Sequence, residues 1–169
     1  MHRTRVWITL GCCLFLATIF ANAQTRKAGL WEVTTTMTWQ QSPFPAGMGG
    51  GANSPFTPGP HTTQVCVTQE QIDKYGTPFS QNRGDCQVSN VVKKVDGMNA
   101  TMTCTGRVTG NGTMEASWND DDHSTAKVHF TGTMQAGPTP KPIEWTSDST
   151  SVFKSADCGD VKPFVMPAK

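Results

Sequence analysis

Apolar and polar side chains alternate with a period of two in successive stretches of this 169-residue chain, and this pattern constrains its fold more than any other feature. Successive side chains of a β-strand point to opposite faces, so the alternation marks strands with one buried face. The stretches span residues 31–40, 62–67, 86–95, 98–105, 113–118, 126–134 and, with weaker alternation, 143–154. The chain is therefore expected to fold as a mainly all-β protein.

Turn-forming residues separate most of these stretches. Asp96-Gly97 is a strong two-residue hairpin signal, Gly110-Asn111-Gly112 predicts the next turn, and residues 119–123 predict a polar turn. Consecutive antiparallel strands with one apolar face must bury that face, either by curling into a barrel or half-barrel or by packing as a sandwich. We favour a curved antiparallel meander, a barrel or half-barrel, that a short helix and a loop close in part.

A Pro/Gly-rich segment, residues 41–61, interrupts the alternation. Its prolines and glycines deny it both a strand ladder and a helix, so we expect a disordered loop or a functional flap. One short helix is expected at residues 69–75. Thr68 suits its N-cap, Gln71 stands three residues later as the partner of a capping box, and Gly76 stops the helix.

The N-terminus has the three parts of a secretory signal. Arg3 and Arg5 precede an apolar run over residues 7–20, and Ala21-Asn22-Ala23 forms a small-x-small end. The apolar run is shorter than the about 20 residues of a membrane span. We therefore expect a signal peptide at residues 1–23 and a single β domain at 24–169, periplasmic or secreted, with no transmembrane segment after cleavage.

Four cysteines follow the signal segment, and an even number in an oxidising compartment predicts two disulfides. We predict that Cys86 joins Cys104, since the Asp96-Gly97 turn makes their strands neighbours, and that Cys66 joins Cys158, which ties down the C-terminus. A two-residue turn would leave Cys86 three residues out of register, so this pairing requires a bulge or a bend near Cys86. A bond between Cys66 and Cys86 is the alternative.

Charge and motifs exclude some functions. Residues 24–169 carry a formal charge of about −1, since Arg3 and Arg5 belong to the signal, and a near-neutral surface gives no electrostatic reason to bind nucleic acid. Residues Asp120, Asp121, Asp122 and His123 look like a metal cluster, but they occupy a predicted turn and lack calcium-loop spacing, so we assign no metal site. We also assign no catalytic or cofactor-binding residue.

The predicted inner faces hold an unusual number of Met and Trp side chains. Soft Met-rich surfaces adapt to varied ligands, so these side chains either form a plain core or line a cavity for a small apolar ligand. The candidate lining residues are Trp31, Met37, Trp39, Met102, Met114, Trp118 and Phe130.

Several short motifs occur in a distinctive order. These are Lys27-Ala28-Gly29-Leu30-Trp31-Glu32, then Cys66-Val67-Thr68-Gln69-Glu70, then Cys86, Cys104 and Asp157-Cys158. The order resembles the exported bacterial family known only as a domain of unknown function, DUF3617. That resemblance implies a periplasmic or envelope location and supplies no activity, cofactor or catalytic residue. The short motif Gly29-Leu30-Trp31 is also similar to the Gly-x-Trp opening of lipocalins.

These features favour a non-enzymatic envelope protein that acts as a binding or structural module without a cofactor. A lipocalin-like carrier of a small apolar ligand is the first alternative. An unrecognised hydrolase is the second, because catalytic partners can be distant in sequence. The expected partner is thus either another envelope component or a small apolar ligand.

Overall fold

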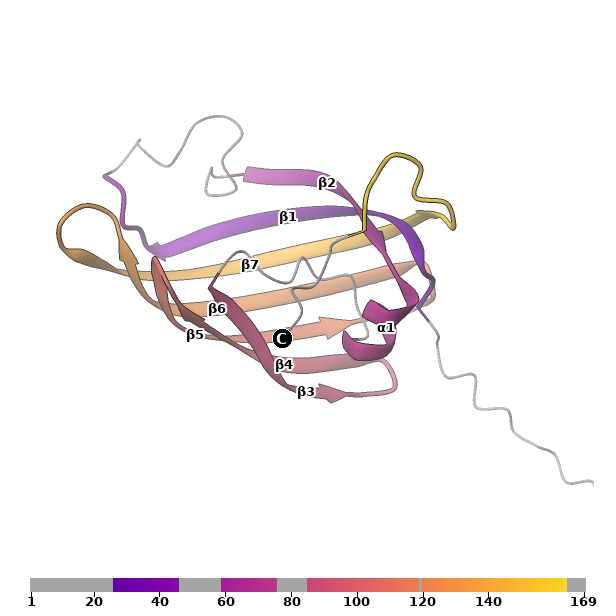
Figure 1. Ribbon diagram of the computed structural model, residues 1–169, viewed down its shortest axis with the longest axis horizontal. Coiled ribbons are helices and arrows are strands. Elements are labelled where there is room, and N and C mark those ends of the chain that lie inside the picture. Colours follow the sequence, from indigo (N-terminus) through magenta and orange to yellow (C-terminus); the bar gives the residue numbers. More distant parts are fainter. Residues whose placement is uncertain (1–25, 46–58, 76–84, 119, 164–169) are drawn as a thin grey trace, which may run out of the picture.

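The computed structural model describes residues 26–45, 59–75, 85–118 and 120–163. These residues form one seven-stranded antiparallel sheet and one short helix, which confirms the mainly all-β expectation (Figure 1). The predicted signal peptide and the middle of the Pro/Gly-rich segment lie outside the described residues. In chain order the elements are β1 (Gly29–Gln41), β2 (Gly59–Val67), α1 (Gln69–Tyr75), β3 (Cys86–Lys93), β4 (Gly97–Thr105), β5 (Val108–Ser117), β6 (His123–Gln135) and β7 (Pro140–Ser155).

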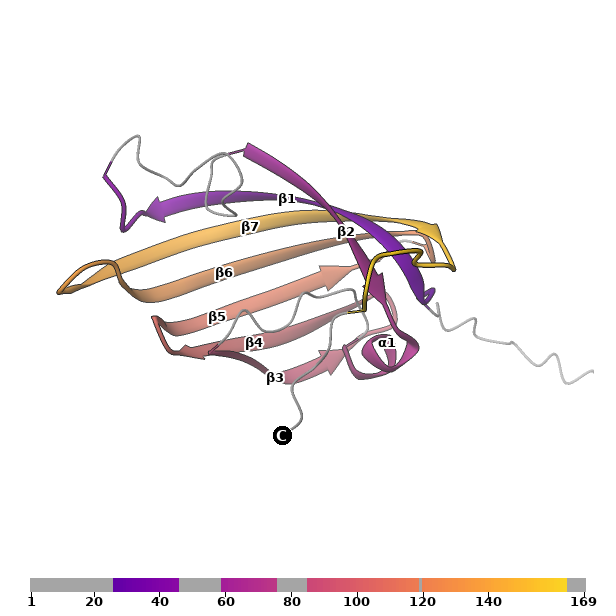
Figure 2. The ribbon, with the colours of Figure 1, turned by 45° about the horizontal axis from the view of Figure 1, so that its top comes forward.

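The strand order is β2-β1-β7-β6-β5-β4-β3. Strands β3 to β7 form the expected meander, and β1 completes it by pairing with β7, so the first and last strands lie side by side. The sheet is strongly curved but stays open, because β2 and β3 remain as its two edges (Figure 2). Of the two expected forms, a barrel and a half-barrel, the fold is therefore the half-barrel. Within the described ranges, no helix is long and apolar enough to cross a membrane.

The two faces of the sheet differ in chemistry. We call the face that carries Trp31, Met98, Phe130 and Ile143 the inner face, since these are the largest side chains with less than 2% exposure. Helix α1 packs on this face at one end of the sheet, where Ile72 joins a cluster with Trp31 and Val67. The opposite, outer face carries mostly threonine and charged side chains.

Helix α1 has the capping box expected from the sequence. The Thr68 hydroxyl accepts a hydrogen bond from the Gln71 amide at 3.3 Å, and the Gln71 side chain accepts one from the Thr68 amide at 2.9 Å. These two bonds satisfy backbone donors that the first turn of a helix leaves free. The predicted helix bounds, 69–75, agree with the structure.

Both predicted disulfides are present, Cys86–Cys104 and Cys66–Cys158. The predicted hairpin turn is displaced: Lys94 N donates to Gly97 O, so Val95 and Asp96 form the turn and Gly97 begins β4. This displacement shifts the pairing of β3 with β4 by two residues from the one that an Asp96-Gly97 turn would give. A bulge between Ser89 and Val92, where Asn90 has a φ of 51°, moves it by one more. Together they place Cys86 directly opposite Cys104, which confirms that a bulge is needed.

The predicted turn at Gly110-Asn111-Gly112 is wrong, because these residues lie within β5. The chain reverses at residues 106–107 instead. Gly110 and Gly112, together with Gly132 of β6, face the ring of Phe130. A Cβ at any of the three would lie 3.0–3.2 Å from that ring, so the glycines make room for a buried aromatic side chain rather than for a turn.

The strands also extend further into proline-containing sequence than expected. Strand β2 begins at Gly59 rather than at residue 62, so part of segment 41–61 does hold a ladder. Pro60 is tolerated there because β2 is an edge strand, where a missing N–H need not break a pairing. Strand β7 likewise begins at Pro140 rather than at residue 143.

Candidate ligand-binding face

The inner face carries its largest side chains near the two ends of the strands. At one end, Phe130 stacks on Trp145 with a centroid distance of 5.5 Å, and Trp39 is the register partner of Trp145 on β1. The side chains come from β1, β7 and β6, so they form an aromatic row across three strands. The row packs with Ile143 and Cys104 in one hydrophobic cluster. We call it the Phe130 end.

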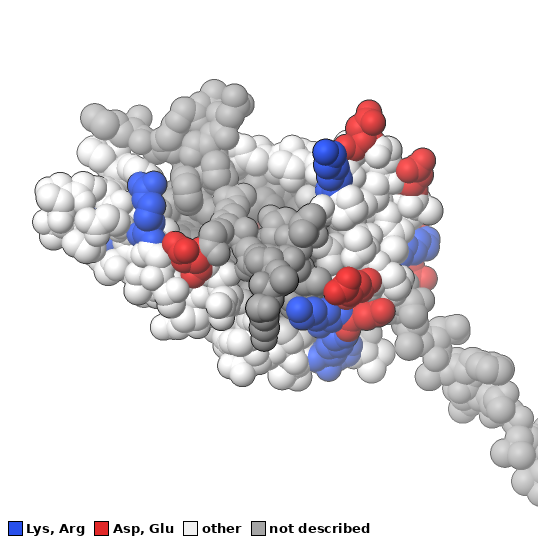
Figure 3. Space-filling view, in the orientation of Figure 1, with Lys and Arg blue, Asp and Glu red and all other residues white. Residues whose placement is uncertain are grey.

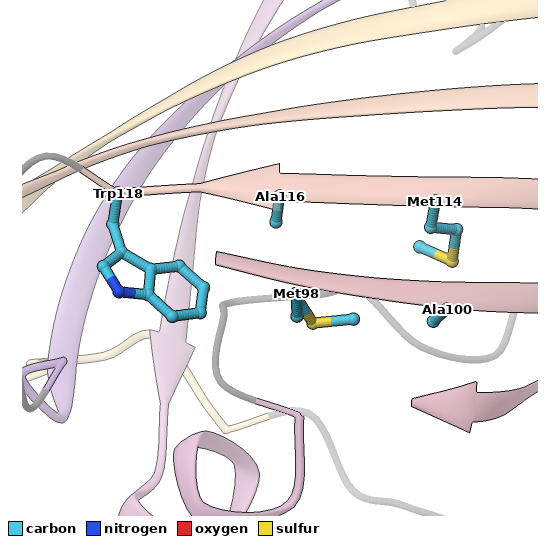
Figure 4. Packing of buried hydrophobic residues seen from close by; sticks show 5 residues of the cluster. All are labelled: Met98, Ala100, Met114, Ala116 and Trp118. Atoms are coloured by element: carbon cyan, nitrogen blue, oxygen red, sulfur yellow. The ribbon is translucent and has the colours of Figure 1, made fainter. Parts of the chain in front are cut away.

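The other end is built around Trp31. Its ring meets Phe153 edge-on at 5.4 Å, and its indole N–H donates to Lys27 O at 3.0 Å. Trp118 lies nearby and packs with Met98, Ala100, Met114 and Ala116 (Figure 4). The Trp118 N–H donates to Val95 O at 3.1 Å, so this buried indole is also satisfied. We call this the Trp31 end.

Arg26 lies at the Trp31 end and is only 3% exposed. Its guanidinium carbon lies 4.3 Å from the Trp31 ring centre and 5.6 Å from that of Trp118. Nη1 donates to His123 O at 3.1 Å and Nη2 donates to Ser124 Oγ at 3.0 Å. The sequence shows only a short polar lead here, and no pattern in it marks Arg26 as a buried residue.

Burial lowers the pKa of Arg26 from its ordinary value to about 10, and the carboxylates of Asp120, Asp121 and Asp122 oppose this shift. The side chain therefore stays charged at neutral pH. Its charge is balanced by the adjacent acidic turn and by the electron-rich faces of two indoles. One donor is left over, because Nε is buried and has no hydrogen-bond partner among the described residues.

The acidic turn before β6 is held by its own side chains. Asp120 Oδ1 accepts from the amides of Asp122 and His123 at 2.8 and 2.7 Å, and its carboxylate lies 3.0 Å from the His123 ring. These contacts lower the pKa of Asp120, the backbone hydrogen bond from Asp122 most of all. No group of three metal-ligating side chains is assembled within the part of the chain that the structure describes.

Small side chains occupy the inner face between the two aromatic ends. One row runs Thr35, Ser149 and Ala126 across β1, β7 and β6. Strand β7 adds Ser147 and Ser151 on either side of Ser149, at successive inner positions. We call these residues the small-residue band.

Two of the hydroxyls in the band are unusual. Ser147 and Ser151 are 8% and 7% exposed, and neither makes a side-chain hydrogen bond to another described residue. Ser149, in contrast, lies 2.8 Å from the hydroxyl of Thr35. Among the described residues, the buried side-chain atoms without a hydrogen-bond partner are Arg26 Nε and Asp121 Oδ1, so the hydroxyl oxygens of Ser147 and Ser151 remain open to water.

The structure distributes the predicted lining residues over the inner face. Trp31 lies at the Trp31 end, Trp39 and Phe130 lie at the Phe130 end, and Met114 and Trp118 belong to the cluster of Figure 4. Met102 packs against two of the clusters, and Met37 pairs with Ser147 beside the band. The proposed lining role of these residues stays a prediction. Sequence reasoning missed Arg26 and the serines of β7. The only signal for the serines was the weak alternation of apolar and polar side chains along β7.

Two hollows formed by described residues lie on the outer face instead. One, of about 520 Å³, is lined by side chains such as Thr34, Thr150, Lys127 and Asp148. The other, of about 420 Å³, includes Thr101, Thr113 and His129, and Met102 also borders it. Both are broad and open to solvent. Charged side chains of both signs are scattered over the molecule, as the view in Figure 3 shows for one side.

Comparison with known proteins places most of the chain in a family. The model of a family described as "Protein of unknown function (DUF3617)" matches residues 26–158, which is most of the chain. No curated protein and no solved structure matches. The matched region runs from Arg26 to Cys158, so it spans the whole sheet and both disulfides. The chain belongs to the DUF3617 family of proteins of unknown function.

Proposed function

We propose that this protein is an exported, non-enzymatic binding protein that holds a small apolar ligand against the inner face of its half-open sheet. The observation that carries the proposal is the small-residue band between the Phe130 and Trp31 ends. A sheet that only needed a core would fill its centre with large apolar side chains, since native interiors are densely packed. Ser149 and Ala126 are short and only half-buried, and in this proposal the ligand lies over them.

Export is supported by the chemistry of the chain. Two disulfides are stable in oxidising compartments and rare in the cytosol. The N-terminal residues have the composition of a secretory signal. An apolar ligand that must cross an aqueous compartment needs a protein surface that shields it, and an open half-barrel offers one without a closed cavity.

Two variants of neighbouring residues on β6 test whether the band binds a ligand. Ala126→Phe fills the band from β6, whereas Thr125→Phe places the same ring on the outer face of the same strand. The full chain is expressed with its own N-terminus and purified from the envelope fraction. Binding is measured by the fluorescence of diphenylhexatriene, a hydrocarbon probe. Mass spectrometry of the extracted protein then identifies any ligand that co-purifies.

We expect the wild-type protein and Thr125→Phe to bind the probe equally, and Ala126→Phe to bind it at least tenfold more weakly. Circular dichroism confirms that both variants fold. Equal binding by all three proteins, or no binding by any, would refute the proposal. Methyl cis-parinarate, an ester probe, tests the hydrolase alternative in the same experiment: conversion of the ester to the free acid would refute the non-enzymatic part.

A further inference from the structure

The two edges of the sheet differ in how well they are protected against pairing with another strand. An exposed edge offers unpaired backbone N–H and C=O groups, and proteins commonly block such an edge with a bulge or with lysine side chains. Edge strand β3 has both, the bulge at Asn90 and the charge of Lys93, whose side chain also bonds to the backbone of α1 at Asp73. Strand β2, at the opposite edge, has neither a bulge nor a Lys, Arg, Asp or Glu side chain among its nine residues (Figure 2).

The direction of the backbone groups of β2 follows from one contact near its end. Among the described residues, only Pro163 pairs with β2 on the side away from β1, through an isolated parallel bridge to Cys66. Proline has no backbone N–H, so the bridge uses the N–H and C=O of Cys66 itself. Backbone groups alternate between the two sides of a strand, so those of Gln64, Thr62 and Pro60 also face away from β1.

Thr62 and Gln64 therefore turn backbone donors and acceptors away from the sheet. Both residues are exposed, and the strand that carries them pairs with β1 in an unbroken register. Pro60 offers a carbonyl but no N–H, so it limits the row of donors at one end. The bridge between Cys66 and Pro163 limits it at the other. The β2 edge is thus a short, neutral stretch of strand with unpaired groups and fixed limits on both sides.

We propose that the β2 edge pairs with the β2 edge of a second copy of this chain, antiparallel about a two-fold axis. Such pairing is isologous, so the same surface serves both copies. Thr62 then lies opposite Thr62 of the second copy, and the two residues exchange N–H···O=C hydrogen bonds. The Gln64 N–H donates to the carbonyl of Pro60 in the second copy, and symmetry supplies the reverse bond. The pairing is independent of a ligand on the inner face.

The bridge at Cys66 also selects the register of this pairing. An axis at Thr63 would place Pro60 opposite Cys66 of the second copy. The outward groups of Cys66 already pair with Pro163, so two segments would compete for one position. An axis at Thr62 keeps the second copy clear of the bridge. The proposed dimer therefore has Thr62 at its centre.

A second copy also suits the two faces of β2. Thr62 lies on the outer face, where its hydroxyl is 2.9 Å from that of Thr34 on β1, and Val65 packs against the cluster of Trp31 on the inner face. A strand added at this edge must therefore alternate polar and apolar side chains, as β2 itself does. Because β2 carries no like charges, the two copies do not repel each other there. About four backbone hydrogen bonds make a small interface, so we expect a weak dimer with a dissociation constant of about 1 μM or higher.

The test compares two variants that gain the same charge on the outer face. Thr62→Lys places an ammonium group at the two-fold axis, where the two copies then repel each other. Thr34→Lys is the matched control, because it loses the same hydroxyl contact with Thr62 but lies one strand away from the edge. Each full-chain protein is purified from the envelope fraction, and circular dichroism verifies its fold. Sedimentation equilibrium at low ionic strength, where charges are least screened, measures self-association.

We expect a monomer–dimer equilibrium for the wild type and for Thr34→Lys, and a dissociation constant about tenfold higher or more for Thr62→Lys. Amide hydrogen exchange of the wild type gives a second measurement that needs no variant. Raising the protein concentration should slow exchange at Thr62 and Gln64, whose N–H groups face the second copy. Exchange at His61 and Thr63, whose N–H groups face β1, should not change.

Three results would each overturn this inference. The first is a wild-type protein that stays monomeric at every concentration. The second is protection of the Thr62 and Gln64 amides that does not depend on concentration, which would mean that another part of the same chain covers the edge. The third is a dimer that Thr62→Lys does not weaken relative to Thr34→Lys, which would place the contact elsewhere on the molecule.

Discussion

The guanidinium carbon of Arg26 lies 4.3 Å from the centre of the Trp31 ring. Two residues separate Arg26 from the start of β1 at Gly29, and its side chain bonds to His123 and Ser124 at the start of β6, two strands away in the sheet. The segment before the first strand is therefore fixed to a strand that follows it by about a hundred residues. Arg26 closes the Trp31 end of the inner face.

Arg26→Ala should destabilise the fold by about 2–4 kcal/mol, because it removes two hydrogen bonds and two indole contacts from a buried position. Arg26→Lys should also lower the free energy of unfolding, but by less than Arg26→Ala. An ammonium group keeps the charge but cannot lie flat on a ring and donate hydrogen bonds in two directions at once. Urea unfolding measures both. Lys27→Ala is the control: its ion pair with Asp122 is exposed, so the unfolding midpoint should not move. Similar midpoints for Arg26→Ala and Lys27→Ala would show that the buried contacts are unimportant.

Asp120 should titrate below the ordinary carboxyl pKa of 3.8, because its charged form accepts hydrogen bonds from Asp122 and His123. Its pKa is lower in the folded than in the unfolded protein. The stability it contributes is therefore complete above the unfolded pKa and is lost as the pH falls through the folded pKa. NMR titration of the Asp122 and His123 amide shifts measures this. Asp120→Asn should abolish the transition, and a midpoint at or above 3.8 would contradict the assignment.

Much of the fold followed from the sequence because it depends on local patterns. The alternation from Trp31 onward identified the strands, and the Thr68 capping box located α1. The two disulfides were predicted from the order of the strands. The bulge near Asn90 was needed to bring Cys86 opposite Cys104, and it is present.

The errors arose where a residue's role depends on contacts distant in sequence. Gly110-Asn111-Gly112 has the composition of a turn, and only the position of Phe130 on the neighbouring strand explains why two glycines stand inside β5. Arg26 looks like part of a polar lead until Trp31 and Trp118 are placed beside it. Ser147 and Ser151 weaken the alternation of β7, because small polar side chains occupy buried positions of this strand.

Gly132→Ala tests whether the glycines that face the Phe130 ring are needed for its packing. A Cβ at Gly132 would lie 2.1 Å from the backbone oxygen of Thr109 and 3.0 Å from the Phe130 ring, so β5 and β6 would have to separate. We expect a loss of about 2–4 kcal/mol in the free energy of unfolding, as for other overpacked positions. Thr133→Ala, on the exposed face of the same strand, is the control and should cost less than about 1 kcal/mol. A Gly132→Ala protein as stable as the control would mean that the sheet relaxes freely there.

The two disulfides should contribute unequally to stability, since they close loops of different length. Cys66–Cys158 spans 92 residues and Cys86–Cys104 spans 18. In the chain-entropy model these loops correspond to about 4.6 and about 3 kcal/mol. Replacing each pair by alanine and measuring urea unfolding gives the two contributions, and peptide mapping without reductant verifies the remaining bond. Cys66–Cys158 also joins the end of edge strand β2 to the segment after β7, so its loss should additionally increase amide exchange in β2. A larger loss from the Cys86 and Cys104 replacement would show that native packing at the Phe130 end, where Cys104 is 2% exposed, outweighs loop entropy.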